Sequence, residues 1–296
     1  MRIAASARHW GAVLAGLALA TAAIPAQARQ AQTPTSPAST FQSGWAAYQR
    51  GDFATARTLF QRACDGKNAQ ACFNLGYMLR TGQGGPADLP KALNLYQRAC
   101  DGNEAQGCFS LGLMLSKGMG VPADLPKARS AFQRACDGND VDGCFNLGLM
   151  LVNAQGGPAH LPNARTALQR ACDLKDAGGC YNLGVLLRDG KGGPADLPRA
   201  RSLFERACDG KSAEGCSGLA TMLAKGEGGS ADLPRARSLA QRACDGGNAH
   251  GCFSLGTFLV KGEGGAFDLP AARAAFQRAC DGGYTRGCTA RSMLGQ

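Results

Sequence analysis

Seven related stretches of sequence decide how this chain folds. The chain reads CDGNEAQGC from Cys100 to Cys108 and CDGNDVDGC from Cys136 to Cys144. The paired cysteines recur every 36 residues without insertion or deletion, at positions 64/72, 100/108, 136/144, 172/180, 208/216, 244/252 and 280/288. A strict repeat of this length is typical of a solenoid built from stacked units.

Each unit carries two helical patterns, which we name helix A and helix B. Before the first cysteine of a pair, apolar residues follow the i, i+3, i+4, i+7 spacing of a buried helix face: Ala92, Leu95, Tyr96 and Ala99 in one copy. This helix B is expected to begin at Asp88-Leu89-Pro90, with the aspartate as N-cap. After the second cysteine, a similar pattern predicts helix A, and a glycine-rich loop separates it from the next helix B.

A glycine recurs inside helix A, four residues after the second cysteine. It stands at Gly76, Gly112, Gly148, Gly184 and Gly256. Glycine costs about 1 kcal/mol in a helix interior. Its recurrence therefore predicts close contact between two helices.

The first residues carry the three parts of a secretory signal peptide. Arg2 and Arg8 form a basic start, an uncharged run from Gly11 to Ile24 follows, and Ala26-Gln27-Ala28 gives an A-x-A end. Because the run is shorter than the roughly 20 apolar residues of a membrane span, we expect cleavage after Ala28 rather than an anchor. The chain is then periplasmic or secreted.

The expected organisation follows from the period. Residues 1–28 are the signal peptide, and residues 29–40, rich in Pro, Ser, Thr and Gln, are expected to be a disordered lead-in. Residues 41–296 form the solenoid, with units at about 41–67, 68–103, 104–139, 140–175, 176–211, 212–247 and 248–283 and a C-terminal cap at 284–296.

The unit resembles the Sel1-like repeat, a relative of the tetratricopeptide repeat. Its wording is A-x-G-C-F-x-L-G-x-x-L-x-x-G-x-G-G-x-A-D-L-P, followed by R-A-C-D-G. With a C-x7-C pair in every unit, the chain is similar to the secreted Helicobacter cysteine-rich proteins. The resemblance implies an all-α, right-handed superhelix of α/α hairpins, each clipped by a disulfide. It also implies one of two functions, an interaction module or a penicillin-binding protein with weak β-lactamase activity.

The cysteines suit a disulfide framework better than a metal or redox site. Zinc sites use closer spacing together with histidines, and thioredoxin-like pairs read C-x-x-C. An even cysteine count in an exported chain indicates disulfides. Many connectivities are possible, but the strict repetition favours local pairing: Cys64–Cys72, Cys100–Cys108, Cys136–Cys144, Cys172–Cys180, Cys208–Cys216, Cys244–Cys252 and Cys280–Cys288.

The residues offer no familiar catalytic motif. S-x-x-K, S-D-N and K-T-G, which β-lactamases and penicillin-binding proteins use, do not occur, and neither does H-E-x-x-H or G-x-S-x-G. His160 stands where other units have an N-cap aspartate, and His250 stands at a solvated helix start. The sequence therefore predicts no catalytic residue, no metal and no cofactor.

Two sets of arginines recur with the repeat. One set lies two residues before each first cysteine, as at Arg98 and Arg134, and an aspartate such as Asp101 lies one residue after it. We expect this set to form Arg–Asp clamps between hairpins, with a ladder for an anionic ligand as the alternative. The second set is expected to be exposed and to carry the net charge: Arg129, Arg165, Arg201, Arg237 and Arg273.

A polar stripe on helix A is the candidate binding site. Two residues after the second cysteine stand Asn74, Ser110, Asn146, Asn182 and Ser254. In tetratricopeptide-like superhelices helix A lines the concave surface. There an asparagine amide can both donate to and accept from an extended peptide.

The sequence therefore predicts a monomeric, exported scaffold that binds a protein or peptide. The formal charge of +10 also suits anionic polymers of the cell envelope, which gives a second alternative after β-lactam hydrolysis. No nucleic-acid partner is expected for an exported chain.

Overall fold

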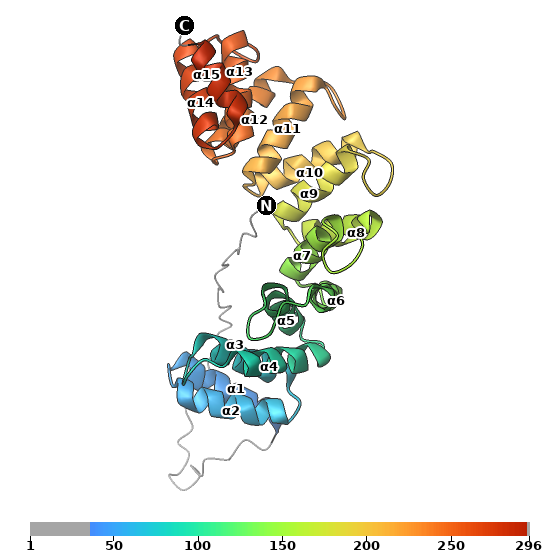
Figure 1. The fold of residues 1–296 in the computed structure, drawn as a ribbon, viewed down its shortest axis with the longest axis vertical. Coiled ribbons are helices and arrows are strands. Elements are labelled where there is room, and N and C mark those ends of the chain that lie inside the picture. Colours follow the sequence, from blue (N-terminus) through green and yellow to red (C-terminus); the bar gives the residue numbers. More distant parts are fainter. Residues whose placement is uncertain (1–35, 295–296) are drawn as a thin grey trace, which may run out of the picture.

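The structure, a computed structural model, describes residues 36–294 as a stack of α-helices with no strand in that range (Figure 1). The helices are α1 (Pro37–Gln49), α2 (Phe53–Asp65), α3 (Ala69–Thr81), α4 (Leu89–Asp101), α5 (Ala105–Lys117), α6 (Leu125–Asp137), α7 (Val141–Val152), α8 (Leu161–Asp173), α9 (Ala177–Arg188), α10 (Leu197–Asp209), α11 (Ala213–Lys225), α12 (Leu233–Asp245), α13 (Ala249–Lys261), α14 (Leu269–Asp281) and α15 (Thr285–Met293).

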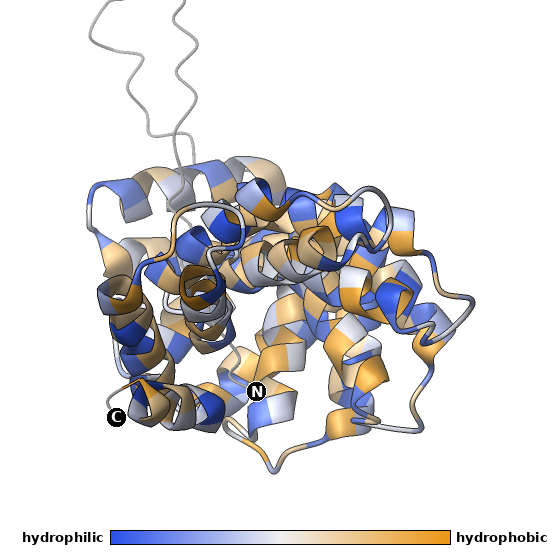
Figure 2. Cartoon of the chain, turned by 90° about the horizontal axis from the view of Figure 1, so that it is seen from above, coloured by the Kyte–Doolittle hydropathy of each residue, from blue (hydrophilic) through white to orange (hydrophobic). Residues whose placement is uncertain are grey.

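The helices pair into hairpins, with odd-numbered A helices and even-numbered B helices. Each A helix packs on the B helix that follows it, and each B helix packs on the next A helix. Viewed along the long axis, successive hairpins are rotated relative to one another (Figure 2). The stack is therefore a superhelix, and the predicted all-α solenoid is confirmed.

The first helix begins earlier than the sequence predicted. The expected disordered lead-in at residues 29–40 is wrong from Pro37 onward, where α1 begins. Ser36 and Ser39 form a capping box, because each side chain accepts a hydrogen bond from the other's backbone N–H. The composition pointed to disorder, but the cap and the contact of Phe41 with Phe60 hold this segment as helix.

The B helices begin as predicted. The carboxylate of Asp88 accepts a hydrogen bond from the backbone N–H of Lys91 at 3.0 Å, and proline follows in the first turn. His160 takes the same place in α8, where its Nδ1 accepts from the backbone N–H of Asn163 at 3.3 Å. His160 is therefore an N-cap, as its position in the repeat indicated.

The recurring glycine of helix A lies against a large side chain of helix B. A Cβ at Gly76 would lie 2.9 Å from the ring of Tyr96, and one at Gly112 would lie 2.7 Å from the ring of Phe132. In the α11/α12 hairpin the opposing residue is Ala240, and the glycine is replaced by Ala220; both side chains are buried. The predicted helix contact is confirmed, and the glycine is needed only where a large side chain faces it.

The cysteines form seven disulfides, each joining a B helix to the next A helix. All 14 cysteines are paired: Cys64–Cys72, Cys100–Cys108, Cys136–Cys144, Cys172–Cys180, Cys208–Cys216, Cys244–Cys252 and Cys280–Cys288. Between the two cysteines the chain turns through a residue with positive φ, such as Asn103 at 62°. Each bridge thus clips two consecutive hairpins together.

Candidate functional site

The A helices line the inner side of the superhelix. Among helices of the same kind in neighbouring units, the most extensive contacts are between A helices, in the pairs α11/α13, α9/α11 and α3/α5. A curved stack has its shorter spacing on the concave side, so the exposed side chains of the A helices form a concave surface.

The predicted asparagine and serine stripe lies on these A helices. Asn74, Ser110, Asn146, Asn182 and Ser254 are all half-buried. The amide Nδ2 of Asn146 donates to the carbonyl of Asp142 at 2.8 Å, and Asn182 does the same with Gly178. Each of these two amides thus uses one N–H within its helix. Its Oδ1 and second N–H remain for a ligand.

The residues three positions further along each A helix change character along the stack. Tyr77, Leu113, Leu149 and Val185 are partly exposed, and Thr221 and Thr257 occupy the same place in α11 and α13. Tyr77 is 36% exposed, and the guanidinium of Arg80 lies over its ring at 5.4 Å. The surface beside the stripe is therefore apolar over α3 to α9 and hydroxylated over α11 and α13.

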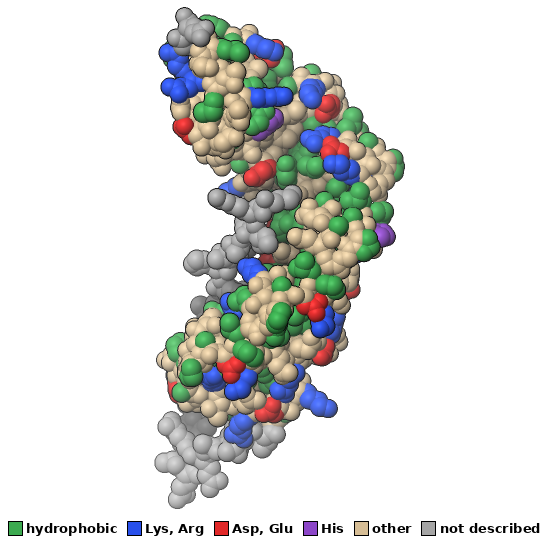
Figure 3. All heavy atoms as spheres, in the orientation of Figure 1, with side chains coloured by type: hydrophobic (Ala, Val, Ile, Leu, Met, Phe, Trp, Pro, Cys, Tyr) green, Lys and Arg blue, Asp and Glu red, His purple; other side chains and the backbone are tan. Residues whose placement is uncertain are grey.

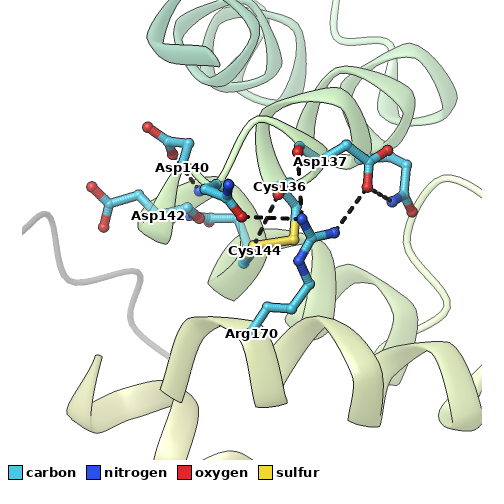
Figure 4. Close-up of a disulfide and its surroundings, with 10 residues drawn as sticks. Cys136, Asp137, Asp140, Asp142, Cys144 and Arg170 are labelled. Atoms are coloured by element: carbon cyan, nitrogen blue, oxygen red, sulfur yellow. Dashed lines mark hydrogen bonds and ion pairs between the residues drawn. A yellow bond between two sulfur atoms is a disulfide. The ribbon is translucent and has the colours of Figure 1, made fainter. Parts of the chain in front are cut away.

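The first arginine set forms clamps between neighbouring units. Arg170 of α8 contacts the carboxylate of Asp137 at 3.0 Å and the side-chain carbonyl of Asn139 at 3.2 Å, beside the Cys136–Cys144 disulfide (Figure 4). Arg98, Arg134, Arg206, Arg242 and Arg278 each donate to the backbone carbonyl of the first cysteine one unit earlier. The clamp prediction is confirmed, so these guanidinium groups serve the fold.

The second arginine set is also used by the fold. Arg273 is exposed as expected, but the other four arginines of the set are half-buried, which corrects the expectation for them. Arg129 donates to the carbonyl of Pro158 at 3.0 Å, and Arg201 donates to the carbonyl of Ser230 at 2.9 Å. Arg165 and Arg237 reach the equivalent loop of the next unit, and Arg273 reaches the carbonyl of Leu294. The glycine-rich loop of each following unit covers helix B, and its turned carbonyls capture the arginine.

Charges on the visible surface alternate in sign. On the face drawn in Figure 3, Lys and Arg side chains lie among Asp and Glu side chains rather than in a continuous basic stripe. On this face the charges therefore form no continuous basic ladder, and arginines of both sets are engaged by the fold.

Carboxylates gather at the start of α7. Burial raises the pKa of Asp140 to about 6, and the negative charges of Asp142 and Glu104 add to the shift, while the N–H of Gly143 opposes it. Figure 4 shows Asp140 and Asp142 on the side of the disulfide away from Arg170. This carboxyl group therefore titrates above the usual range for aspartate.

The structure also pairs two residues that the sequence analysis did not connect. The Oγ of Ser217 in α11 lies 2.9 Å from Nδ1 of His250 in α13, and the imidazole meets the ring of Tyr284 edge-on. Burial lowers the pKa of His250, and the positive charges of Arg188, Arg286 and Lys225 lower it further. The signal in the sequence was Ser217 itself, which replaces an aromatic residue of the repeat.

No described residues form a metal site or a membrane span. Across residues 36–294 no three His, Cys, Asp or Glu side chains are grouped to hold an ion. In the same range no helix is both long and apolar enough to cross a bilayer. The predicted signal peptide and its cleavage after Ala28 lie outside the described residues.

These features define a repeat protein, an α/α solenoid whose hairpins are joined by disulfides. The family model for the Sel1 repeat matches residues 41–68, 69–104, 105–140, 177–212 and 213–248, more than half of the chain. The chain therefore belongs to the Sel1 repeat family. Seven disulfides are typical of folding in an oxidising compartment, and such solenoids are scaffolds for protein interactions.

Solved structures share the fold. The chain is similar to c5321, a protective antigen of uropathogenic Escherichia coli with the SLR fold, at a TM-score of 0.78 and 23% identity over 87% of this chain and 56% of that one. The chain thus spans about half the length of that relative. A Sel1 repeat protein from Oxalobacter formigenes matches at a TM-score of 0.66 and 23% identity, over 81% of this chain and 96% of that one.

A shorter match involves a cysteine-rich relative. Helicobacter pylori cysteine rich protein B is 32% identical over 44% of this chain and 92% of that one, with a TM-score of 0.36. No curated protein sequence matches the chain significantly.

Proposed function

We propose that this protein is an exported scaffold that binds an extended protein segment along its concave A-helix surface. The observation that carries the proposal is the half-buried polar stripe at one position of the A helices, which holds Asn in α3, α7 and α9 and Ser in α5 and α13, with Gly218 interrupting it in α11. Asn146 and Asn182 keep a free acceptor and a free donor, which match the backbone of an extended peptide. Partly exposed apolar residues beside the stripe would receive side chains of the same segment.

A selection with displayed dodecapeptides tests the proposal. Peptides selected on the oxidised chain are compared on two triple variants by their dissociation constants. Asn74→Ala, Asn146→Ala and Asn182→Ala together should weaken binding about tenfold or more, because each lost amide contact contributes roughly 1 kcal/mol.

The matched control changes exposed serines on B helices, Ser130→Ala, Ser202→Ala and Ser238→Ala, and should leave binding unchanged. Equal binding by both variants would remove the stripe from the function.

The β-lactam alternative is tested separately. Ser217 and His250 have the spacing of a nucleophile and its base, but Ser217 is only 5% exposed, which leaves little access for a substrate. Turnover of a chromogenic cephalosporin, or a penicillin adduct in the intact mass, would favour the enzyme over the scaffold. The control is a reduced and alkylated sample.

Export remains a prediction that protein chemistry can test. A secreted or periplasmic form should begin at Arg29, the residue after the expected cleavage at Ala28. N-terminal sequencing of protein from the periplasm and the medium decides both the cleavage point and the compartment.

A further inference from the structure

The hairpin formed by α11 and α12 departs from the repeat in its buried interior. In the neighbouring units an aromatic residue follows the second cysteine and contacts an aromatic residue of helix B, as Tyr181 contacts Phe204 at 5.7 Å and Phe253 contacts Phe276 at 5.5 Å. Ser217 and Ala240 stand in these two places here. A pair of rings is thus replaced by a hydroxyl and a methyl group.

The side chain of His250, in the next A helix, contacts this hairpin at Ser217. Its Nδ1 lies 2.9 Å from the Ser217 hydroxyl, which is buried, while another part of the His250 residue remains exposed to solvent. In the neutral ring the direction of this hydrogen bond depends on which nitrogen carries the proton. In the charged ring both nitrogens carry protons, so Nδ1 donates to the hydroxyl and Nε2, on the other side of the ring, can donate to a ligand.

The charged groups that act on His250 are cationic. They are Arg188 of α9, Lys225 of α11 and Arg286 of α15, and all three lower its pKa by repulsion. Arg188 contacts Asp189 at 2.8 Å and Lys225 contacts Glu227 at 3.5 Å, both at the C-terminal ends of their helices. The nearby carboxylate on the first turn of α11 is Glu214, which accepts a hydrogen bond from Ser212. The imidazole therefore lies in a positive field without a carboxylate of its own.

We propose that the His250 imidazole, held by the Ser217 hydroxyl and surrounded by the positive charges of Arg188, Lys225 and Arg286, recognises a carboxylate of the bound protein segment. The proposal rests on the scaffold function above and names the chemistry of its partner, an acidic peptide. A carboxylate at Nε2 would accept a charge-assisted hydrogen bond, and it would relieve the repulsion among the cations.

The test follows the histidines of the oxidised chain by proton–carbon NMR. The probes are a capped hexapeptide of alternating Glu and Ala and the same peptide with Gln in place of Glu. The Glu peptide should shift the His250 signal and raise the pKa of His250, because a bound carboxylate stabilises the imidazolium. His160, which caps α8, serves as the internal control and should not respond.

Variants then locate the charges. Lys225→Gln with Arg286→Gln should weaken the Glu peptide about fivefold or more. Arg62→Gln with Lys67→Asn removes the same two charges from the first unit and should change nothing. The proposal is overturned by a His250 signal that stays still, by an equal response to the Gln peptide, or by an equal response to inorganic phosphate at the same charge concentration.

The two proposals fail in different ways. If the triple asparagine variant binds the selected peptides as tightly as the parent while His250 still responds to the Glu peptide, the proposed role of the asparagine stripe is wrong and the carboxylate site stands. If selected peptides depend on the asparagines but His250 ignores the Glu peptide, the scaffold stands and the carboxylate site is wrong.

Discussion

Arg134 of α6 contacts the carboxylate of Asp101 at the end of α4 at 2.9 Å, although 33 residues separate them. The same guanidinium donates to the backbone carbonyl of Cys100, next to the Cys100–Cys108 disulfide. One side chain thus satisfies a helix-end carbonyl and an ion pair between two units. The disulfide and the clamp therefore act at the same junction of the solenoid.

Removing one clamp should loosen that junction. Arg134→Ala leaves the Cys100 carbonyl without its donor, and we expect a loss of about 1–2 kcal/mol in the free energy of unfolding. Most of this loss comes from the carbonyl bond, because the ion pair with Asp101 is partly exposed and screened. Urea unfolding followed by circular dichroism measures it. Arg62→Ala, at the equivalent position of α2, is the control; an equal loss there would mean that the clamp has no special value.

Removing one disulfide should cost more than removing one clamp. Cys136→Ala with Cys144→Ala opens a ring that constrains the unfolded chain, and the model of loop entropy gives about 2–3 kcal/mol. Urea unfolding of the variant measures the loss, and hydrogen exchange should show faster opening of α6 and α7 than of α13 and α14. Uniformly faster exchange would indicate that the bridge acts on the whole stack instead.

Acidification should stabilise the folded protein through Asp140, because protonation removes its unfavourable negative charge. Its pKa is raised to about 6 in the folded protein from an ordinary value of 3.8, so the folded state binds the proton more tightly than the unfolded state. Stability is therefore lost as the pH rises from about 4 to 6, and it stays lower above that range.

Asp140→Asn keeps the N-cap acceptor for the N–H of Gly143 without the charge. At pH 7 the variant should be more stable than the parent by up to about 3 kcal/mol, because each unit of the pKa shift corresponds to about 1.4 kcal/mol. Thermal unfolding across pH 3.5 to 7.5 measures the difference, which should vanish near pH 4. A constant difference at every pH would assign the effect to something other than titration.

The glycine and the ring that faces it should behave as a coupled pair. Gly112→Ala places a methyl group against Phe132, and overpacking of this kind costs about 1–3 kcal/mol. In a background with Phe132→Ala the same change should cost much less, as the natural Ala220 and Ala240 pair indicates. A double-mutant cycle of unfolding free energies measures the coupling. Strictly additive losses would show that the Phe132 ring is not the reason why position 112 requires glycine.

Much of the fold could be predicted from the repeat, because a helical hairpin is a local structure. The spacing of Ala92, Leu95 and Tyr96 predicts one buried helix face, and Asp88 and Pro90 predict where that helix begins. Repetition supplied the stacking and favoured local disulfide pairing. The lead-in was the exception, because the composition of residues 29–40 concealed the cap made by Ser36 and Ser39.

The candidate site was only partly predictable. The periodicity placed Asn74, Asn146 and Asn182 on one helix face, since residues at equivalent positions of a repeat point the same way. It could not show that Asn146 and Asn182 each spend one N–H within the helix.

The sequence by itself determined the helices, their order and the cysteine pairs, because these depend on contacts within one unit or across one turn. Only the tertiary structure decided what the units do to one another. Arg129, expected to be an exposed charge, donates a hydrogen bond to the loop carbonyl of Pro158. His250 lies against Ser217, a contact that the sequence did not indicate. Both contacts join residues about 30 positions apart in the sequence. Whether two such residues meet depends on how each hairpin is rotated relative to the hairpin before it.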